Sequence, residues 1–522
     1  MKLFSLSLLF SILTSLTFAA EMNFLIIPEA VIGPISPYIY GLNDQNPSDM
    51  GATIRRLGGN RMTGYNWVNN ASNAGSDYKH SSDDWLCKEH LLSIHCDEPA
   101  GAIFDFVGQN QKAGMESLIT VPMAGYVAAD KNGEVLETEK APSPRWKPIN
   151  FIKKKPYSLT PNTQDKTVYE DEFVNYLVQK LHSASQGGVK FYVMDNEPDL
   201  WSETHPRIHP AKTTYAEMIN KSELLASGIL KADPTAMIFG PASYGWSGFL
   251  SLQAAPDSSK ANEKAGTFLD YYLDQMHSLE VRDHKRLLHV LDIHWYPEAQ
   301  GGGKRITEND ITPASIEARL QAPRSLWDPS YIEKSWIADS TKQPIRLIPW
   351  LQDKITQHYP DTKLAVTEYD YGAGDHISGG LAMADALGVF GKNGVFMSSY
   401  WGDLKPYNKA ALQIYRNYDG KNSTFGDIAV SAAGEDISQT SIYAATDRKH
   451  LGVLWILVIN KNQQNSISGK FKVKGTTVYK TFASYGFNAK SAAITTLPNG
   501  TLNENQFNYN LAPLSATLLV CQ

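Results

Sequence analysis

Short apolar segments alternate with helix-like segments along most of this 522-residue chain, and this alternation limits its fold more than any other feature. Eight of them, between about residues 38 and 415, have the near-continuous apolar character of parallel strands that are buried on both faces. They are YIYGLN (38–43), ATIRRLGG (52–59), ESLITVPM (116–123), KFYVMDN (190–196), AMIFGPA (236–242), LHVLDIHW (288–295), KLAVTEY (363–369) and GVFMSSYW (394–401).

The segments between these strands carry helical periodicity. Phe173, Leu177 and Leu181 repeat at a spacing of four residues, and residues 270–276 and 349–355 lie in similar amphipathic segments. Eight strands that alternate with helices predict an α/β fold, a (β/α)8 TIM-like barrel over residues 36–415. A doubly wound sheet is the alternative, but no GxGxxG or P-loop pattern follows any of the strands.

The sequence pattern changes after about residue 415: helical periodicity is lost, and short predicted strands follow one another with Gly, Asn and Ser turns between them. Such spacing predicts an additional C-terminal antiparallel β-sandwich domain over residues 416–522. The strand-like segment MNFLIIPEAVI (22–32) precedes the barrel. We expect residues 20–35 to form an N-terminal strand that joins this β domain.

The first 19 residues have the character of a secretory signal peptide: one Lys, then a short apolar run rich in Leu, Phe and Ser, then small residues. We expect cleavage after Ala19 and a secreted, extracellular protein. No later segment approaches 18 uninterrupted apolar residues, so no membrane span is expected. The net charge of −6 argues against a nucleic-acid partner.

Three cysteines are present, at positions 87, 96 and 521. In an oxidising compartment Cys87 and Cys96 are suited to pair, which leaves Cys521 over. A zinc site built from CKEHLLSIHC (87–96) is the alternative, although its spacing matches no common zinc-finger pattern.

Polar and aromatic residues follow most of the predicted barrel strands, where the active site of such a barrel lies. The fourth strand runs into Asn196 and Glu197, and Pro198 then stops it; an ordinary turn is the alternative reading of this stretch. The seventh strand carries Glu368 to the same rim. Two carboxylates that face one cleft fit glycoside hydrolysis, although sequence does not decide between a retaining pair (about 5–5.5 Å apart) and an inverting pair (about 6.5–9.5 Å).

Three neighbouring residues suit the same chemistry. Asn196 could hold the sugar 2-hydroxyl, a contact that strengthens in the transition state. His294 and Tyr296, after the sixth strand, could hydrogen-bond the nucleophile and keep it ionised. Packing within the barrel rim is the alternative for both.

The motifs as a group resemble glycoside hydrolase family 44. They are RRLGGNRMTGYNWVNNASNAGSDY (55–78), MDNEPDLW (194–201), DIHWYPE (292–298) and AVTEYDYG (365–372). The resemblance implies a secreted endo-β-1,4-glucanase or xyloglucanase that acts with retention and needs no cofactor for its chemistry. It also implies that Glu197 is the acid/base and Glu368 the nucleophile.

A β-glucan polysaccharide is therefore the expected partner of a chain that we expect to be a monomer. Its flat C–H faces stack on indole rings and its hydroxyls need amides. Candidate substrate-binding residues are Asn43, Asn60, Asn66, Trp67, Trp327, Trp336 and Trp401. Asp77, Asp83 and Asp84 are candidates for a structural calcium site, because that ion prefers oxygen ligands; a solvated loop is the alternative.

Two rival functions remain from the sequence alone. One is another retaining glycosidase, such as a xylanase or an arabinofuranosidase, which shares the glutamates on the fourth and seventh strands. The other is a carbohydrate-binding protein without catalysis. The preference among xyloglucan, cellulose and mixed-linkage glucan is not encoded in any motif that we identify.

Overall fold

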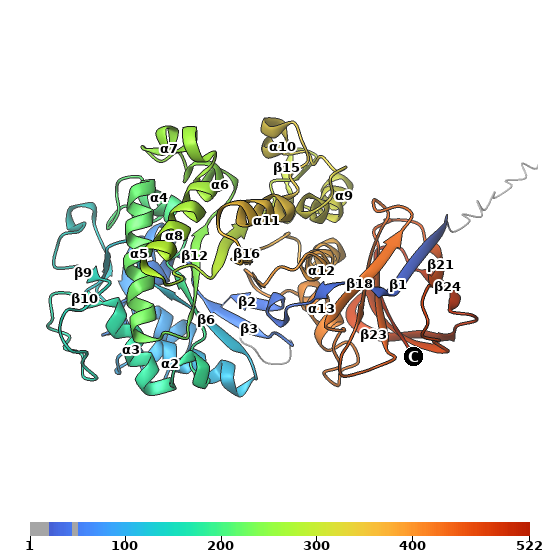
Figure 1. Cartoon of the computed structure of the whole chain (residues 1–522), viewed down its shortest axis with the longest axis horizontal. Helices are drawn as coiled ribbons and strands as arrows, with labels where there is room; N and C mark the ends of the chain where they lie inside the picture. The colour runs from blue at the N-terminus through green and yellow to red at the C-terminus, as the bar shows by residue number, and fades with distance from the viewer. Residues whose placement is uncertain (1–19, 44–50) are drawn as a thin grey trace, which may run out of the picture.

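Eight parallel strands close into a barrel in the computed structural model, which describes residues 20–43 and 51–522 (Figure 1). Their order around the barrel follows their order in the chain. The strands are β2 (Gly41–Asn43), β3 (Ile54–Leu57), β6 (Glu116–Val121), β11 (Phe191–Met194), β12 (Met237–Ser243), β13 (Val290–Trp295), β16 (Lys363–Tyr369) and β17 (Met397–Tyr400). Each overlaps one of the eight predicted segments, so the barrel is confirmed and the doubly wound alternative is wrong.

The barrel interior is a packed core and not a pore, as is typical of this architecture. Phe191, Phe239 and Phe396 meet there, with ring centroids 5.7–6.2 Å apart. Tyr38, which precedes β2, closes this end with an edge-on contact to Phe191 at 5.1 Å. These aromatic rings fill the end of the barrel where the strands begin. The polar side chains of the site lie at the opposite rim, at the carboxyl ends of the strands.

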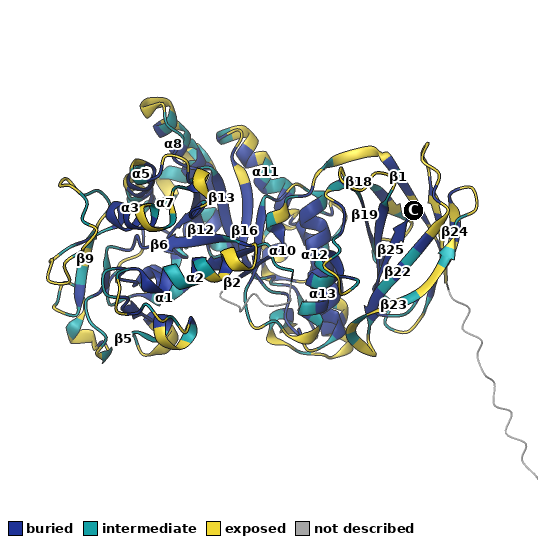
Figure 2. Ribbon diagram, turned by 90° about the horizontal axis from the view of Figure 1, so that it is seen from below, coloured by how far each residue is buried: buried dark blue, intermediate teal, exposed yellow. Residues whose placement is uncertain are grey.

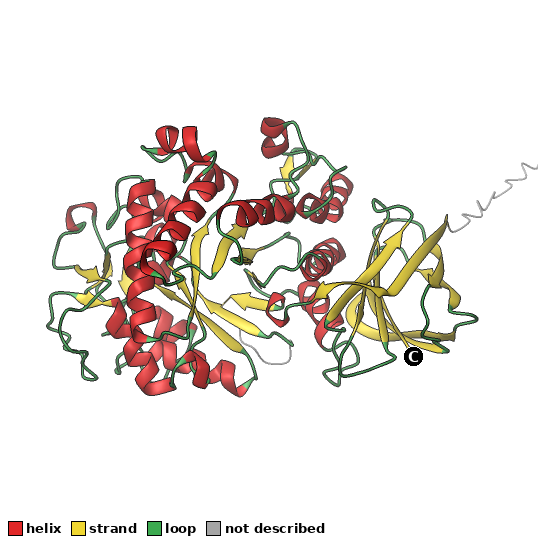
Figure 3. Cartoon of the chain, in the orientation of Figure 1, coloured by secondary structure: helices red, strands yellow, loops and turns green. Residues whose placement is uncertain are grey.

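Helices surround the barrel (Figure 3). The predicted periodic segment at 173–181 lies in α3, with Phe173 and Leu177 buried. The longer helices are α2 (Gly101–Lys112), α3 (Glu170–Leu181), α5 (Tyr215–Ala232), α8 (Phe268–Asp283), α11 (Leu347–His358), α12 (Ile377–Lys392) and α13 (Pro406–Arg416). Shorter ones are α1 (Asn60–Thr63), α4 (Trp201–Thr204), α6 (Trp246–Ser251), α7 (Ser258–Ala265), α9 (Pro313–Gln321) and α10 (Trp336–Thr341).

A nine-stranded, mostly antiparallel sheet lies beside the barrel. Its order is β23-β22-β25-β20-β19-β18-β1-β21-β24. The first strand of the chain, β1, pairs antiparallel with β18 and parallel with β21. The strands are β1 (Ala20–Pro34), β18 (Ile428–Gly434), β19 (Thr440–Thr446), β20 (Leu454–Asn460), β21 (Ile467–Val473), β22 (Thr481–Asn488), β23 (Ser491–Thr501), β24 (Gln506–Leu511) and β25 (Ser515–Cys521).

The sheet folds over itself, so that strands far apart in its order share one core. Phe482 of β22 and Phe507 of β24 lie with ring centroids 4.7 Å apart, and Phe507 stacks on Phe471 of β21 at the same distance. This arrangement confirms the predicted fold class, a barrel with an additional antiparallel β domain.

Helix α12 joins the two parts and is buried along nearly its whole length (Figure 2). Tyr443 of β19 donates a hydrogen bond to Asp385 of α12 at 2.5 Å, and Lys461 forms a buried ion pair with the same carboxylate at 2.9 Å. Gly388 allows this approach, because a Cβ atom there would lie 2.4 Å from the Tyr443 ring. The barrel and the sheet are therefore in tight contact.

Cys87 and Cys96 form a disulfide, with their Cα atoms 5.8 Å apart, so their sulfurs are not available for the alternative zinc site. Cys521 is free and buried, and burial raises the pKa of its thiol to about 12. The predicted signal peptide (1–19) lies outside the described residues. Within the described ranges, no helix has both the length and the apolar character needed to cross a membrane.

Candidate active site

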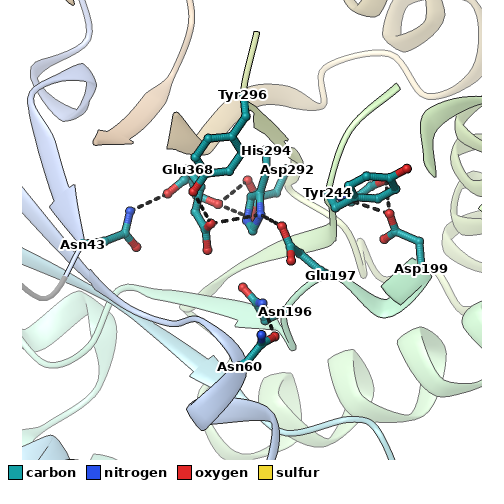
Figure 4. Close-up of polar contacts among 12 residues, drawn as sticks. Asn43, Asn60, Asn196, Glu197, Asp199, Tyr244, Asp292, His294, Tyr296 and Glu368 are labelled. Carbon is teal, nitrogen blue, oxygen red and sulfur yellow. Dashed lines mark hydrogen bonds and ion pairs between the residues drawn. The ribbon is translucent and has the colours of Figure 1, made fainter. Parts of the chain in front are cut away.

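Glu197 and Glu368 meet at one rim of the barrel although they come from different strands (Figure 4). Glu368 belongs to β16, whereas Glu197 lies three residues beyond the end of β11. The chain turns sharply here: Asp195 and Glu197 both have left-handed backbone angles, with φ values of 62° and 42°. Pro198 then begins a short 3-10 turn. Strain of this kind persists only where the surroundings fix it, and it concentrates at functional sites.

The buried carboxylate of Asp195 is what fixes this turn. It accepts hydrogen bonds from the Thr63 hydroxyl at 2.6 Å and from the backbone N–H groups of Met123, Ala124 and Asn196. The Asp195 side chain thus binds backbone groups of the loop that follows β6 and of the turn that carries Glu197. The Asp before the Asn-Glu-Pro sequence is therefore a structural residue that aims Glu197 at the cleft.

Glu368 is held by two donors. Arg56 Nη1 lies 2.6 Å from its Oε1, and the Tyr296 hydroxyl donates to its Oε2 at 2.8 Å. Both contacts stabilise the ionised carboxylate. Gly58 leaves the necessary space, since a Cβ atom there would lie 2.3 Å from the Arg56 guanidinium carbon.

Glu197 occupies a less polar environment. Only 16 % of its side-chain surface is exposed, and burial raises its pKa to about 7. His294 Nδ1 lies 2.8 Å from Glu197 Oε1 and 3.5 Å from Glu368 Oε2. Burial lowers the pKa of His294 to about 3, so this ring is neutral. The raised pKa of Glu197 suits a general acid, whereas Glu368 is held by a guanidinium and a phenol hydroxyl.

The two carboxyl groups are close. One oxygen of Glu197, one oxygen of Glu368 and one ring nitrogen of His294 all lie within 4.8 Å of one another. Two further buried acids, Asp199 and Asp292, flank the site, and burial raises the pKa of each to about 7. These two carboxyls are engaged by neighbouring groups, Asp292 by the Thr367 hydroxyl and Asp199 by the Tyr244 backbone N–H.

Two cavities lie at the barrel mouth, one beside Asn43 and Trp401 and one beside Glu197, and we call them the two parts of the groove. The larger part has a volume of about 760 Å³, and the smaller part, which Glu197 lines, about 180 Å³. Main lining residues of the larger part are Asn43, Gly58, Gly59, Asn60, Arg61, Asp77, Tyr78, Asp83, Asp84, Trp85, Glu89, His90 and Trp401. The smaller part is lined by Glu197, Tyr244, Trp246, Trp295, Tyr296, Glu298, Arg305 and Trp336, among others.

Comparison with known proteins agrees with this geometry. The model of glycoside hydrolase family 44 matches residues 71–299. Endoglucanase A of Paenibacillus lautus is 47 % identical over 508 residues, which cover 96 % of this chain and 73 % of that protein. The chain belongs to glycoside hydrolase family 44. The resemblance inferred from the motifs is thus confirmed, and the chain is a glycoside hydrolase.

Solved structures extend the family assignment to the whole described chain. A family 44 xyloglucanase of Paenibacillus polymyxa, solved with xyloglucan, is 44 % identical with a TM-score of 0.94; the match covers 96 % of this chain and 99 % of that one. An α-L-arabinofuranosidase of Thermotoga maritima has 12 % identity and a TM-score of 0.59, so this likeness shows a shared fold alone.

Several residues expected to bind sugar have structural roles in this family 44 chain. Trp67 is only 1 % exposed: it stacks on Phe173 at 5.7 Å and donates its indole N–H to the Tyr169 carbonyl. Trp327 lies under Lys392 in a cavity of about 150 Å³ between α12 and the sheet, away from the barrel mouth. The structure therefore places neither indole in the groove: Trp67 is buried, and Trp327 lines a different cavity.

The asparagines at the rim also differ from expectation. Asn43 donates its amide to the Thr367 carbonyl at 2.9 Å and accepts from Arg56 at 3.0 Å, so it braces the arginine, and it also lines the larger part of the groove. Asn66 is buried and donates to the Ala128 carbonyl at 2.8 Å, which makes it a brace of its loop. Asn196 accepts from Arg56 at 2.7 Å and lies 3.4 Å from Asn60, and both remain candidates for sugar binding.

Trp401 and Trp336 do line the groove, one in each part. Gly59 permits the position of Trp401, because a Cβ atom there would lie 2.6 Å from the indole and its φ of 76° disfavours other residues. Sequence reasoning missed Arg56, which holds Glu368, and Tyr244, which borders Glu197's side of the groove. A charged residue within the apolar strand ATIRRLGG was the available signal for Arg56.

The carboxylates proposed for calcium are already paired with other side chains. Asp77 accepts from Asn60 at 2.9 Å, Asp83 binds Arg61 at 2.5 Å, and Asp84 binds Lys88 at 2.7 Å. A calcium ion would have to displace two of these cations. In the described part of the chain, Glu197, His294 and Glu368 form a group whose spacing could hold a metal. The Arg56 charge on Glu368 disfavours a cation at that point.

Proposed function

We propose that this chain is a secreted, endo-acting glucanase that cleaves β-1,4 linkages of xyloglucan and related soluble glucans with retention of configuration. Glu368 is the nucleophile and Glu197 the acid/base. The observation that carries this proposal is the closeness of the two carboxyl groups, which have oxygens within 4.8 Å of one another. A retaining pair needs about 5–5.5 Å between carboxyl groups, whereas an inverting pair needs about 6.5–9.5 Å to admit a water.

In the first step Glu368 attacks the anomeric carbon of the sugar and a glycosyl-enzyme ester forms. Arg56 and Tyr296 support this role, since their charge-assisted hydrogen bonds orient the Glu368 carboxylate for attack. At the same time Glu197 gives its proton to the departing glycosidic oxygen. A carboxyl group with a pKa of about 7 is protonated at the start of a reaction in weakly acidic medium.

In the second step the ionised Glu197 takes a proton from water, and this water attacks the same anomeric carbon and releases Glu368. His294 supports both steps. Its Nδ1 faces two carboxylate oxygens, so it carries the ring proton and donates to Glu197 Oε1. The acid proton is then left to the other oxygen, Oε2, of Glu197. No metal or organic cofactor takes part in this cycle.

The two cavities support internal cleavage of a polymer: Glu197 lines one, and the other is lined by Asn43, which binds the arginine that holds Glu368. Trp401 on one side and Trp336 on the other offer indole surfaces to the flat faces of sugar rings. Relatives named as an endoglucanase and as a xyloglucanase support the substrate class. Residues 1–19 have the composition of a secretory leader, which fits action on an extracellular polysaccharide.

The first experiment measures new reducing ends and loss of viscosity on xyloglucan, carboxymethylcellulose, mixed-linkage glucan and xylan. We expect a rapid fall in viscosity on a β-1,4-glucan and its loss in Glu368→Gln. Absence of cleavage of every β-1,4-glucan by folded protein would overturn the proposal. Proton NMR of the first product anomer tests retention: an initial β-anomer is expected, and an initial α-anomer would contradict the mechanism.

Azide separates the roles of the two glutamates. With an activated aryl glycoside, Glu197→Ala should give a β-glycosyl azide, because azide replaces water in the second step. Glu368→Ala should give an α-glycosyl azide, because azide then attacks directly in place of the missing nucleophile. The reverse pattern would exchange the two assignments.

A further inference from the structure

Residues 83–90, which we call the groove wall, contribute six residues to the lining of the larger part of the groove. Asp83, Asp84, Trp85, Leu86, Glu89 and His90 all line this part. The same space is also lined by Asn43 and Trp401, next to the strands that carry Arg56 and Glu368. Its volume of about 760 Å³ lies in the range of pockets that enclose a drug-sized molecule, about 300–1,000 Å³, which leaves room for more than one sugar ring.

The groove wall is rigid at its centre. The Trp85 indole contacts the Arg61 guanidinium, 4.5 Å from its ring centroid, and stacks nearly parallel on the His90 ring at 4.7 Å. Arg61 is in turn held by Asp83 at 2.5 Å. Both partners pack against the indole, which remains half-buried and lines the groove. What the wall offers a ligand is its polar groups, which suit the hydroxyls of a sugar.

The disulfide ties the groove wall to the loop that contains Asn70. Cys87 lies within the wall and is bonded to Cys96, whose carbonyl accepts from Asn70 at 3.1 Å. Between them, the segment is anchored to α2 through Asp105, which binds the Ile94 backbone N–H at 3.0 Å and His95 at 2.8 Å. These ties hold a loop with two strongly exposed apolar residues, Leu92 and Ile94.

The groove wall lies on the glycone side of the cleavage site under the proposed mechanism. Glu197 protonates the leaving group, and it lines the smaller part of the groove. The larger part adjoins Asn43 and Trp401 and does not include Glu197, so it takes the sugar units on the other side of the scissile bond.

We propose that the groove wall binds glucan units beyond the one attacked by Glu368, and that the Cys87–Cys96 disulfide sets how strongly the enzyme distinguishes long from short substrates. This inference rests on the proposed function. It assigns to the disulfide loop a role in specificity, separate from the catalytic step at the barrel rim.

Aryl β-glycosides of cello-oligosaccharides with two to five glucose units test this inference, because the added units occupy the glycone side alone. Release of the aryl group, with product analysis to confirm the bond cleaved, gives kcat/KM for each length. The variants are Cys87→Ser/Cys96→Ser and Glu89→Ala. Glu89 is an exposed side chain of the wall, so its loss should leave the fold intact. Leu92→Ala, in the same loop but outside the groove, is the matched control.

We expect the wild-type kcat/KM to rise with length. In both test variants it should fall by about five-fold for the longest substrate, the effect of one or two lost hydrogen bonds, and stay unchanged for the shortest. Leu92→Ala should follow the wild type. Equal length dependence in all four proteins would overturn the inference while leaving the proposed function intact. Absence of aryl release and of polymer cleavage by the wild type would overturn the proposed function. If the double variant fails to fold by circular dichroism, Glu89→Ala decides whether the groove wall binds substrate, and wild type treated with a mild reductant and shown to stay folded replaces the double variant as the test of the disulfide.

Discussion

His294 Nδ1 lies 2.8 Å from Glu197 Oε1 and 3.5 Å from Glu368 Oε2, so one ring nitrogen faces both carboxyl groups of the site. Because burial keeps this imidazole neutral, it orients Glu197 without adding a positive charge that would promote loss of the acid proton. The pair thus combines a fixed geometry with a carboxyl pKa that burial raises to about 7.

The pH dependence of kcat/KM follows from this pair. Glu197 must be protonated for the first step, so the rate on polymer should fall as pH rises through about 7. Glu197→Ala should lower the rate on polymer by about 10²–10⁴-fold, the usual contribution of general acid catalysis. On an aryl glycoside with a good leaving group, the first step of this variant should be nearly normal and its alkaline limb should disappear. An alkaline limb near pH 7 that survives in Glu197→Ala would assign the acid elsewhere.

Arg56 is predicted to be indispensable because one guanidinium serves three partners. It binds Glu368 at 2.6 Å, Asn196 at 2.7 Å and Asn43 at 3.0 Å. A lysine ammonium is a point charge without this fork, so Arg56→Lys should lower kcat by about 100-fold or more. The preceding residue on the same strand is the control: Arg55 binds Asn110 at 2.8 Å, so Arg55→Lys should change stability and leave kcat near wild type. Equal kinetic losses in both variants would indicate a general effect on the barrel.

Trp401 and Trp67 should respond differently to truncation although both are indoles of the barrel. Trp401 lines the groove, so Trp401→Ala should raise KM on polymer by about ten-fold, the loss of roughly one aromatic contact. Trp67 is buried against Phe173, so Trp67→Ala should lower the free energy of unfolding by about 3–5 kcal/mol. Thermal melts and steady-state kinetics of both variants make the comparison. A raised KM in Trp67→Ala without loss of stability would show instead that this indole contacts the substrate.

The sequence predicted the strands of the barrel well and the exposure of its side chains poorly, and the two outcomes have different causes. Strand and helix signals are local: the apolar run around Val366 and the Pro at 198 both mark an element without knowledge of its neighbours. Exposure is not local. Trp67 is buried because α3 places Phe173 on it from more than a hundred positions away. No pattern around Trp67 contains that information.

The catalytic pair shows the same division. The Asn-Glu-Pro and Thr-Glu-Tyr sequences, with the order of the strands, were enough to predict that Glu197 and Glu368 face one cleft. Their environments were not predictable, since the pKa of Glu197 depends on burial by the closed barrel and the hold on Glu368 depends on Arg56 from β3. Local motifs therefore identified the two glutamates, whereas contacts between distant parts of the chain determine the surroundings of each carboxyl group.

Glu197→Gln should stabilise the protein, and the effect should depend on pH with a definite sign. The folded-state pKa of about 7 lies above the ordinary value of 4.5, so between these pH values the folded chain holds a proton that the unfolded chain has lost. Stability contributed by this group is therefore present at low pH and declines as pH rises from about 4.5 to 7. Glutamine is uncharged at every pH and can still accept from His294. The stability of the variant should match that of the wild type near pH 4 and exceed it progressively up to about pH 7, by at most about 3 kcal/mol.

Melting temperatures at pH 4.5, 6 and 7.5 provide the measurement. Glu203→Gln, which changes an exposed carboxylate on α4, is the control. A stability difference that stays constant across this range would mean that Glu197 ionises at its ordinary pKa, and the assignment of Glu197 as the acid would lose its electrostatic basis.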